Sequence, residues 1–258
     1  KEKNPNAIVG VFGCMMAEEG SVQELRKRFP FVDFALGTNS LHDLPEALHN
    51  AAHGIKSRKA TIGDAGQEFD LPAHHNEPPL AYINIIHGCN NFCTYCIVPY
   101  VRGREKSRPL SLILQEAAQL KAQGYKEIML LGQNVNSYGN DWNNGQDFAL
   151  LLRELDAMGI DRIRFMTSHP KDLSEEMILA MAECRHVCKQ IHLPVQSGSN
   201  AILKAMNRKY TREHYLMLVD KLRAAMPDIG ITTDLIAGFP GETEQDHRDT
   251  LALMAQVR

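Results

Sequence analysis

Three cysteines stand close together in one short segment of the chain, Cys89, Cys93 and Cys96, at the spacing C-x3-C-x2-C. The segment follows an apolar run, 82–86, that is typical of a buried β-strand. Thiolates are soft ligands that suit zinc or iron–sulfur clusters, and a loop of this length can place three thiolates around one cubane cluster. The spacing therefore predicts a metal or iron–sulfur centre with three cysteine ligands.

No cysteine lies nearby to fill a fourth coordination position. A structural zinc site takes four protein ligands, and His87 is the candidate for the fourth. A 4Fe–4S cluster held by three thiolates instead leaves one iron open to another molecule. A third interpretation, in which the cysteines only pack as small apolar side chains, fits a loop that contains Asn and Thr less well. Both kinds of metal centre stay open at this point.

The cysteine motif, with Tyr95 before its last cysteine, resembles the signature of the radical S-adenosylmethionine (SAM) enzymes. The resemblance implies that Cys89, Cys93 and Cys96 hold a catalytic 4Fe–4S cluster, whose open iron binds the amino and carboxylate groups of SAM. It also makes Tyr95 a candidate contact to the cofactor. In this family an electron from the cluster cleaves SAM to a 5′-deoxyadenosyl radical, so the cofactor supplies the chemistry and the protein positions it.

The composition is that of a globular protein of one large or two modest domains. The chain has 258 residues, 44% of them hydrophobic, and no apolar run of membrane-spanning length. Three of its six cysteines lie in one loop, which is unlike a secreted disulfide framework and suits a reducing cytoplasm. The formal net charge of −3 argues against a wholly basic surface, so any RNA contact must come from a local patch.

The first segment, 1–54, alternates predicted strands and helices in a βαβα pattern, at 7–12, 20–28, 32–36 and 41–53. Functional residues of such a parallel layer follow the strands, and Cys14 follows the first one. The stretches 8–15 and 36–39 resemble the end of the amino-terminal domain of the methylthiotransferases. In that domain three cysteines bind a second 4Fe–4S cluster. The resemblance implies that Cys14 is one of its ligands and that the other two lie upstream of residue 1.

A polar stretch, 55–79, is interpreted as a linker, and its His74 and His75 as solvated side chains without a role. From residue 80 the βα alternation returns and continues to residue 258. Predicted strands and helices take turns, the strands at 82–86, 127–131, 162–166, 190–193 and 229–236 and the helices at 111–123, 148–158, 174–182 and 212–225. Successive βα units predict a parallel, partial TIM-like barrel. The family comparison implies that the last strand and a carboxy-terminal RNA-binding domain lie outside this chain.

Polar residues follow the predicted barrel strands, at 132–134, 167–170, 194–198 and 234–241. The site of such a barrel lies at the carboxyl ends of its strands. By resemblance, the end of the second strand binds the amino group of SAM, and the fourth and fifth strand ends lie near its ribose and adenine. The tripeptide Gly132-Gln133-Asn134 departs from the common Gly-Gly-Glu form of this motif. The candidate contacts to SAM are Gln133, Asn134, Ser168, Gln196, Ser197 and Asp234.

Two further groups of residues have a structural and a functional interpretation. Cys184 and Cys188 would share one helix face if the preceding helix extended that far, and packing explains them better than metal binding. A basic run follows the cysteine loop, formed by Arg102, Arg104, Lys106 and Arg108. Such a run is often only a solvated face, but beside the radical site it could hold the phosphates of an RNA, and Arg102 and Arg104 are the candidates.

The stretches 96–105 and 131–139 resemble the methylthiotransferase branch that modifies tRNA. The resemblance implies addition of a methylthio group to C2 of N6-dimethylallyladenosine next to the anticodon. It implies as partners the anticodon loop of tRNA, an electron donor such as a flavodoxin and a sulfur source, all in the cytoplasm. The open alternatives are an aspartate of a ribosomal protein or another N6-modified tRNA adenosine as substrate, and a non-catalytic iron–sulfur or zinc protein.

Overall fold

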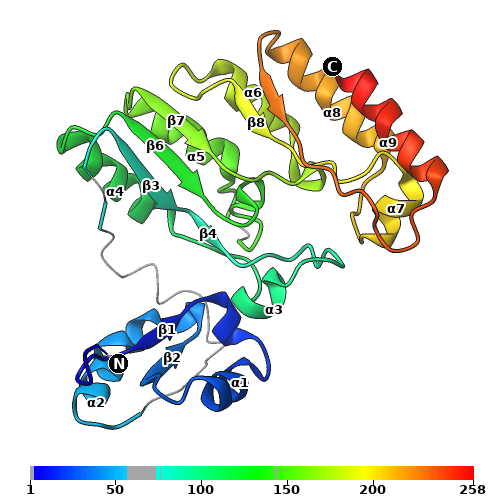
Figure 1. The fold of residues 1–258 in the computed structure, drawn as a ribbon. Coiled ribbons are helices and arrows are strands. Elements are labelled where there is room, and N and C mark those ends of the chain that lie inside the picture. The colour runs from blue at the N-terminus through cyan, green and yellow to red at the C-terminus, as the bar shows by residue number, and fades with distance from the viewer. Residues whose placement is uncertain (1–2, 57–73, 76, 143) are drawn as a thin grey trace. The chain divides into compact units, whose positions relative to one another are not determined.

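The computed structural model describes residues 3–56, 74–75, 77–142 and 144–258. The chain divides into two compact units (Figure 1). The first unit comprises the described residues of 1–73 together with 87–90 and 96–106, and the second comprises those of 74–86, 91–95 and 107–258. The second unit starts near the predicted boundary at residue 80. The cysteine loop is divided between the units, with Cys89 and Cys96 in the first and 91–95, including Cys93, in the second.

The first unit has the predicted βαβα order, and its two short strands, β1 (Gly10–Phe12) and β2 (Phe34–Leu36), pair in parallel. The ring of Phe34 lies where a Cβ on Gly10 would be, so only glycine fits opposite it. Phe34 and Leu36 pack against Ala47 in a small core. The remaining elements are η1 (Cys14–Ala17), α1 (Ser21–Arg28), η2 (Thr38–Asp43), α2 (Leu44–Ala52) and α3 (Val98–Arg102).

The second unit holds the five predicted strands, all of them paired in parallel: β3 (Leu80–Asn84), β6 (Glu127–Leu131), β7 (Arg162–Phe165), β8 (Gln190–His192) and β9 (Gly230–Thr232). Strand β6 lies between β3 and β7, and β8 pairs with β9. A parallel bridge between Ile163 and Val187 joins the two sets. This is the predicted α/β fold, a partial parallel barrel. Two-residue strands β4 (Ile86–His87) and β5 (Lys106–Ser107) fall where the chain passes between the units.

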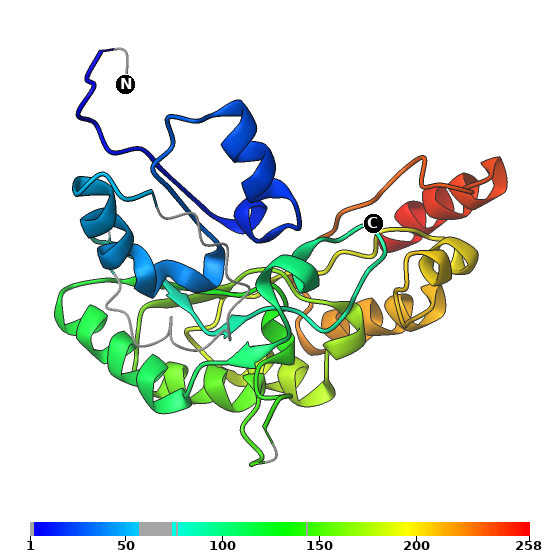
Figure 2. The same ribbon diagram turned by 90° about the horizontal axis from the view of Figure 1, so that it is seen from below.

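The helices of the second unit lie in an arc along one side of its strands (Figure 2). They are α4 (Leu110–Ala122), α5 (Phe148–Ala157), α6 (Glu175–Glu183), α7 (Asn200–Ala205), α8 (Arg212–Ala225) and α9 (Glu244–Val257), with short 3₁₀ turns η4 (Val135–Ser137) and η5 (Pro170–Asp172). The helix α7 is absent from the sequence-based prediction. None of the described helices has the length and apolar character needed to cross a bilayer.

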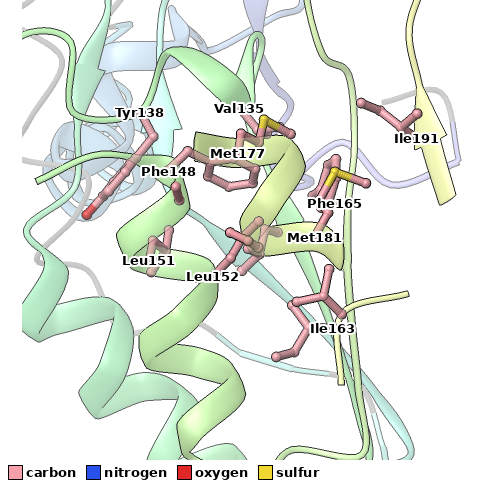
Figure 3. Close-up of a cluster of buried hydrophobic side chains, with 14 of the residues drawn as sticks. Val135, Tyr138, Phe148, Leu151, Leu152, Ile163, Phe165, Met177, Met181 and Ile191 are labelled. Carbon is pink, nitrogen blue, oxygen red and sulfur yellow. The ribbon is translucent and has the colours of Figure 1, made fainter. Parts of the chain in front are cut away.

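The core of the second unit forms where the helices meet the strands. Phe148 of α5 and Phe165 of β7 pack edge to face, with ring centroids 5.3 Å apart (Figure 3). Leu151 and Leu152 on α5 are fully buried, and Met181 on α6 joins them. Because the apolar side chains fill the layer between strands and helices, the polar residues that follow each strand are left at the carboxyl ends of the strands.

Candidate metal centre and cofactor site

The first cysteine is fixed by a close approach of two backbone segments in the first unit. Gly88 has φ +75°, and a Cβ added there would lie 2.1 Å from the carbonyl oxygen of Arg104. The Cys89 N–H donates to the carbonyl of Gly103 at 3.2 Å. The next residue, Asn90, donates through its backbone and side chain to the carboxylate of Glu105. A glycine before Cys89 is therefore a steric requirement.

The segment after Cys96 forms α3, and it is tied to the residues that follow β2. The hydroxyl of Thr38 donates to the carbonyl of Val101 at 3.1 Å. The neighbouring residue Asn39 shares a 2.9 Å hydrogen bond with Nε2 of His87. Burial, helped by the charge of Arg102, lowers the pKa of His87 to about 4. The imidazole Nε2 is thus engaged within the protein, which disfavours His87 as a fourth zinc ligand.

The second cysteine belongs to the second unit and lies against the turn that follows α7. Cys93 is buried, and its Sγ lies 3.5 Å from Nη1 of the equally buried Arg208. The next residue, Thr94, donates through its N–H to the carbonyl of Met206 and through its hydroxyl to that of Ala205. The middle of the cysteine loop is therefore held by a segment more than one hundred residues further along the chain.

Backbone strain gathers in the same part of the second unit. Among the described non-glycine residues, four have a left-handed φ: Phe92, Thr167, Gln196 and Asn207. Phe92 is in the cysteine loop, Thr167 follows β7, Gln196 follows β8, and Asn207 follows α7. Such conformations cost about 1–3 kcal/mol each and are frequent at functional sites, so these four residues agree with the predicted position of the site at the strand ends.

Buried polar atoms without a partner stand at the ends of β6 and β7. In the part of the chain that the structure describes, no hydrogen bond is made by Gln133 Oε1, Asn134 Oδ1, Ser168 Oγ or His169 Nε2. The Nδ2 group of Asn134 donates to Asp172 at 2.7 Å, so only its oxygen is left over. Buried polar atoms are almost always paired, and each of these fits a contact to a bound molecule.

The orphaned atoms after the two strands differ in their chemistry. After β6 the two amide oxygens of Gln133 and Asn134 are acceptors, which suit an ammonium group. After β7 the Nδ1 atom of His169 accepts the backbone N–H of Lys171, which leaves the hydrogen of the neutral imidazole on Nε2. His169 Nε2 is therefore a donor, and the hydroxyl of Ser168 can donate as well. Together these atoms match the ammonium, carboxylate and hydroxyl groups of SAM.

The other candidate contacts to SAM have partners within the protein. The hydroxyl of Ser197 is bonded to Thr250 Oγ1 at 3.3 Å and to the N–H of Ser199 at 3.1 Å. Asp234 is exposed, and it lies 3.3 Å from Nε2 of His192. Gln196 is paired through its backbone with the segment that follows β9. Their roles as cofactor contacts stay predictions.

The predicted basic run does not act as one group. Arg108 belongs to the second unit, where its guanidinium forms an ion pair with Glu116. His75 also lies 3.0 Å from Glu116, so the interpretation of His75 as a solvated side chain was wrong. In the first unit Arg104 and Lys106 are exposed and Arg102 is half-buried. The roles of Arg102 and Arg104 as phosphate contacts stay predictions.

The other cysteines fall outside the loop. Cys14 starts η1 at the carboxyl end of β1, as predicted, and is half-buried. The helix α6 ends at Glu183, so Cys184 and Cys188 do not share a helix face. Cys184 is part of the apolar core, and burial raises the pKa of its thiol. None of the six cysteines forms a disulfide. Within the described residues, no three His, Cys, Asp or Glu side chains form a ready metal-binding group.

The sequence-based prediction missed Arg208, Asn207, His169 and Tyr210 as residues of the site. All four are polar residues in loops, where apolar periodicity gives no signal. A hint was present for His169, because it follows Ser168 at a predicted strand end. Nothing in the sequence separates the buried Arg208 from an exposed arginine.

The fold and the cysteine loop define a radical SAM protein. The model of the radical SAM superfamily matches residues 83–254, and the chain belongs to this family. Proteins of this superfamily bind a 4Fe–4S cluster and SAM, and this chain shares both cofactors.

The chain is also similar over its whole length to proteins named tRNA-2-methylthio-N(6)-dimethylallyladenosine synthase. The relative from Clostridium perfringens is 51% identical over 259 residues, which are 100% of this chain and 58% of the relative. The relative from Thermoanaerobacter sp. (strain X514) is 53% identical over 260 residues, which are 100% of this chain and 55% of the relative. The chain thus spans somewhat more than half the length of these curated relatives.

Solved structures share the fold at low sequence identity. The radical SAM methyltransferase TsrM from Kitasatospora setae, with tryptophan and a SAM analogue bound, is 18% identical, with a TM-score of 0.70 over 97% of this chain and 54% of that chain. The cobalamin-dependent radical SAM enzyme OxsB, with cobalamin and SAM bound, is 15% identical, with a TM-score of 0.69 over 95% of this chain and 38% of that chain. This likeness confirms the predicted fold.

Proposed function

We propose that this chain is the central part of a tRNA methylthiotransferase that modifies C2 of N6-dimethylallyladenosine next to the anticodon. The observation that supports SAM binding by this chain is the set of unpaired, buried polar atoms at the ends of β6 and β7. The names of relatives that are at least half identical over the whole chain support the choice of substrate.

In this proposal Cys89, Cys93 and Cys96 are the ligands of the catalytic cluster. The chain between them is short enough to bring all three thiolates to one cluster, since four residues span at most about 14 Å and three at most about 11 Å. The cluster and SAM, when bound, supply the one-electron chemistry that makes an unactivated C–H position reactive. The chain's own residues bind SAM, exclude water and present the adenine.

The unpaired buried atoms support the following roles in SAM binding. The oxygens of Gln133 and Asn134 accept from the SAM ammonium group. The hydroxyl of Ser168 and the Nε2–H of His169 donate to oxygen atoms of SAM. Tyr95, Gln196, Ser197 and Asp234 complete the predicted site, with Ser197 supporting the loop through its own hydrogen bonds.

The second cluster and the RNA involve the first unit. As the resemblance of 8–15 and 36–39 implies, Cys14 is a ligand of a second 4Fe–4S cluster; its half-buried thiol follows β1 and forms no disulfide. Arg102 and Arg104 hold phosphates of the anticodon loop, whose splayed purine enters the barrel. An electron donor such as a flavodoxin and a sulfur source complete the reaction. The cytoplasm, which keeps thiols reduced, is the expected location.

The first test asks whether the chain performs radical SAM chemistry. The chain is reconstituted anaerobically with iron and sulfide and then mixed with dithionite and SAM. Uptake of about four irons per catalytic cluster and formation of 5′-deoxyadenosine are expected. Zinc uptake without any SAM cleavage would instead support a non-catalytic protein.

The second test identifies the substrate, and it uses the full-length protein. An anticodon stem-loop that carries N6-dimethylallyladenosine should gain a methylthio group, detected by mass spectrometry, whereas the same stem-loop with unmodified adenosine is the matched control. Replacing Arg102 and Arg104 by Glu should weaken binding and flatten its salt dependence, because fewer counterions are released. Modification of a ribosomal-protein aspartate in place of the RNA would overturn the choice of substrate.

A further inference from the structure

The turn that follows α7 is hydrogen-bonded to the middle of the cysteine loop and fixes its conformation. Asn207, at φ +57°, donates through Nδ2 to the carbonyl of Phe92 at 2.8 Å and to that of Asn91 at 3.3 Å. Thr94 bonds back to the carbonyls of Ala205 and Met206. These contacts join two segments that are each strained, since Phe92 also has a left-handed φ. The left-handed conformations of Phe92 and Asn207 persist only because the contacts between the two segments stabilise them.

Arg208 contacts the same part of the cysteine loop, and this arginine is buried, with 5% of its surface exposed. Its Nη2 donates to the carbonyl of Pro194 at 2.7 Å, and its Nε donates to the hydroxyl of Tyr210 at 2.8 Å. Its Nη1 is directed at two atoms of the cysteine loop, Cys93 Sγ at 3.5 Å and Tyr95 Oη at 3.4 Å. The guanidinium thus ties the cysteine loop to the end of β8.

The charge of Arg208 is not balanced by a carboxylate of the described residues. Among the described residues, no Asp or Glu forms an ion pair with this guanidinium, and its neighbours are carbonyls, tyrosine hydroxyls and the sulfur of Cys93. A buried cation without an anion is expensive, so proteins pair buried charges. The group placed to supply the negative charge is the Cys93 sulfur, which is a thiolate whenever it binds a metal.

The hydroxyl of Tyr210 fixes the other side of the guanidinium. Burial raises the pKa of this hydroxyl although Arg208 acts in the opposite direction, so the hydroxyl is neutral. It donates to the carbonyl of Val195 at 2.8 Å and accepts from Arg208 Nε. The Nε and Nη2 groups of the guanidinium are therefore bonded to a neutral hydroxyl and a carbonyl, and neither can neutralise the charge of the arginine.

We propose that Arg208 is a positioning residue for the catalytic cluster: it holds the thiolate of Cys93 and makes the cluster easier to reduce. The inference rests on the proposed function, in which Cys93 is a cluster ligand. A reduced cluster carries one more negative charge, so an N–H···S hydrogen bond and a nearby cation stabilise it and raise its reduction potential.

The experiment compares two substitutions of Arg208 with a matched control. Arg208→Gln removes the charge, Arg208→Lys keeps the charge but loses the fork, and Arg212→Gln removes an arginine of α8 whose Nη1 bonds the backbone of Asp249. Each chain is reconstituted, and the midpoint potential of its cluster is measured by an EPR-monitored redox titration. Hydrogen exchange of the Thr94 amide is measured in the cluster-free chains.

For Arg208→Gln we expect at least a tenfold fall in the reduced fraction at a fixed potential, which corresponds to a shift of about 59 mV to lower potential. Arg208→Lys should shift the potential less, and Arg212→Gln should leave it in place. The Thr94 amide should exchange at least tenfold faster in both Arg208 variants. If Arg208→Gln does not fold, the inference is tested by the shift in midpoint potential and by the faster exchange of the Thr94 amide in Arg208→Lys.

An unchanged potential in the Arg208 variants that fold would overturn the inference. A wild-type chain that takes up no cluster would contradict the proposed function instead. In that case the cluster-free chains still test whether Arg208 holds the loop. If the Thr94 amide of Arg208→Gln exchanges at the same rate as that of the wild type, the arginine does not hold the loop.

Discussion

The imidazole of His169 packs edge to face against the ring of Tyr210, with centroids 5.5 Å apart and ring planes at 79°. The contact buries the histidine, and burial, together with the charges of Arg208 and Lys171, lowers its pKa to about 2. The neutral ring accepts the Lys171 N–H on Nδ1 and keeps its hydrogen on Nε2. The ring contact and this hydrogen bond together keep His169 neutral, with Nε2 as a hydrogen-bond donor.

The first prediction concerns the stability of the cluster-free chain at acidic pH. His169 is neutral in the folded chain but binds a proton below its ordinary pKa of 6.5 once the chain unfolds. Its contribution to the free energy of unfolding is therefore complete above pH 6.5 and is lost as the pH falls toward 2. Urea unfolding between pH 7.5 and 5 should show a loss of up to about 1.4 kcal/mol per pH unit from this residue.

The matched variants compare slopes rather than absolute stabilities. His169→Gln should flatten the dependence of the unfolding free energy on pH, whereas His214→Gln, on α8 and outside these contacts, should keep it. Equal slopes in the wild type and His169→Gln would show that His169 titrates normally in the folded chain.

A second prediction separates steric fit from backbone conformation at two glycines of the first unit. Gly88 and Gly103 both have a left-handed φ, but a Cβ on Gly88 would collide with the backbone of Arg104, whereas one on Gly103 meets no described atom within 4 Å. Gly103→Ala should cost about 1–3 kcal/mol from its conformation alone. Gly88→Ala should cost clearly more and impair iron uptake, as read from urea midpoints and iron content. Equal losses would mean that the two segments are not in close contact.

A third prediction compares the three loop cysteines with Cys184 and Cys188. Replacing Cys89, Cys93 or Cys96 by Ala should remove the catalytic cluster, because three protein thiolates are needed to hold it. The double variant of Cys184 and Cys188 should keep its iron, because Cys184 packs in the apolar core. Its unfolding free energy should fall by about 1–2 kcal/mol, since a buried thiol is lost. Loss of about four irons in this double variant would assign these cysteines to a cluster.

A fourth prediction uses two serines with opposite environments. The buried hydroxyl of Ser168 has no partner among the described residues, whereas that of Ser197 bonds Ser199 and Thr250. Ser168→Ala should therefore stabilise the SAM-free chain by about 1 kcal/mol, and Ser197→Ala should destabilise it by a similar amount. Ser168→Ala should also weaken SAM binding about fivefold in calorimetry, because one hydrogen bond to the cofactor is lost.

The outcome for Ser168 tests the cofactor site directly. A destabilised Ser168→Ala chain with unchanged SAM affinity would show that the hydroxyl has a structural partner and that SAM binds elsewhere.

The sequence by itself determined the class of fold and the chemical character of the loop. The strand 127–131 and the helix 212–225 lie where the apolar pattern places them. The pattern is informative because apolar residues recur at a fixed spacing in strands and helices that bury one face. The spacing of Cys89, Cys93 and Cys96 predicts a metal centre in the same way, since a short loop limits how far apart its thiols can be.

Only the tertiary structure decided which polar residues are buried and which partners they contact. Arg208 and Cys93 are 115 residues apart, and their contact exists because the turn after α7 packs on the cysteine loop. The same holds for the split basic run, in which Arg108 turns to Glu116 while Arg104 stays exposed. Burial and pairing of a polar side chain depend on what the fold brings beside it, and neighbouring residues in the sequence do not encode this.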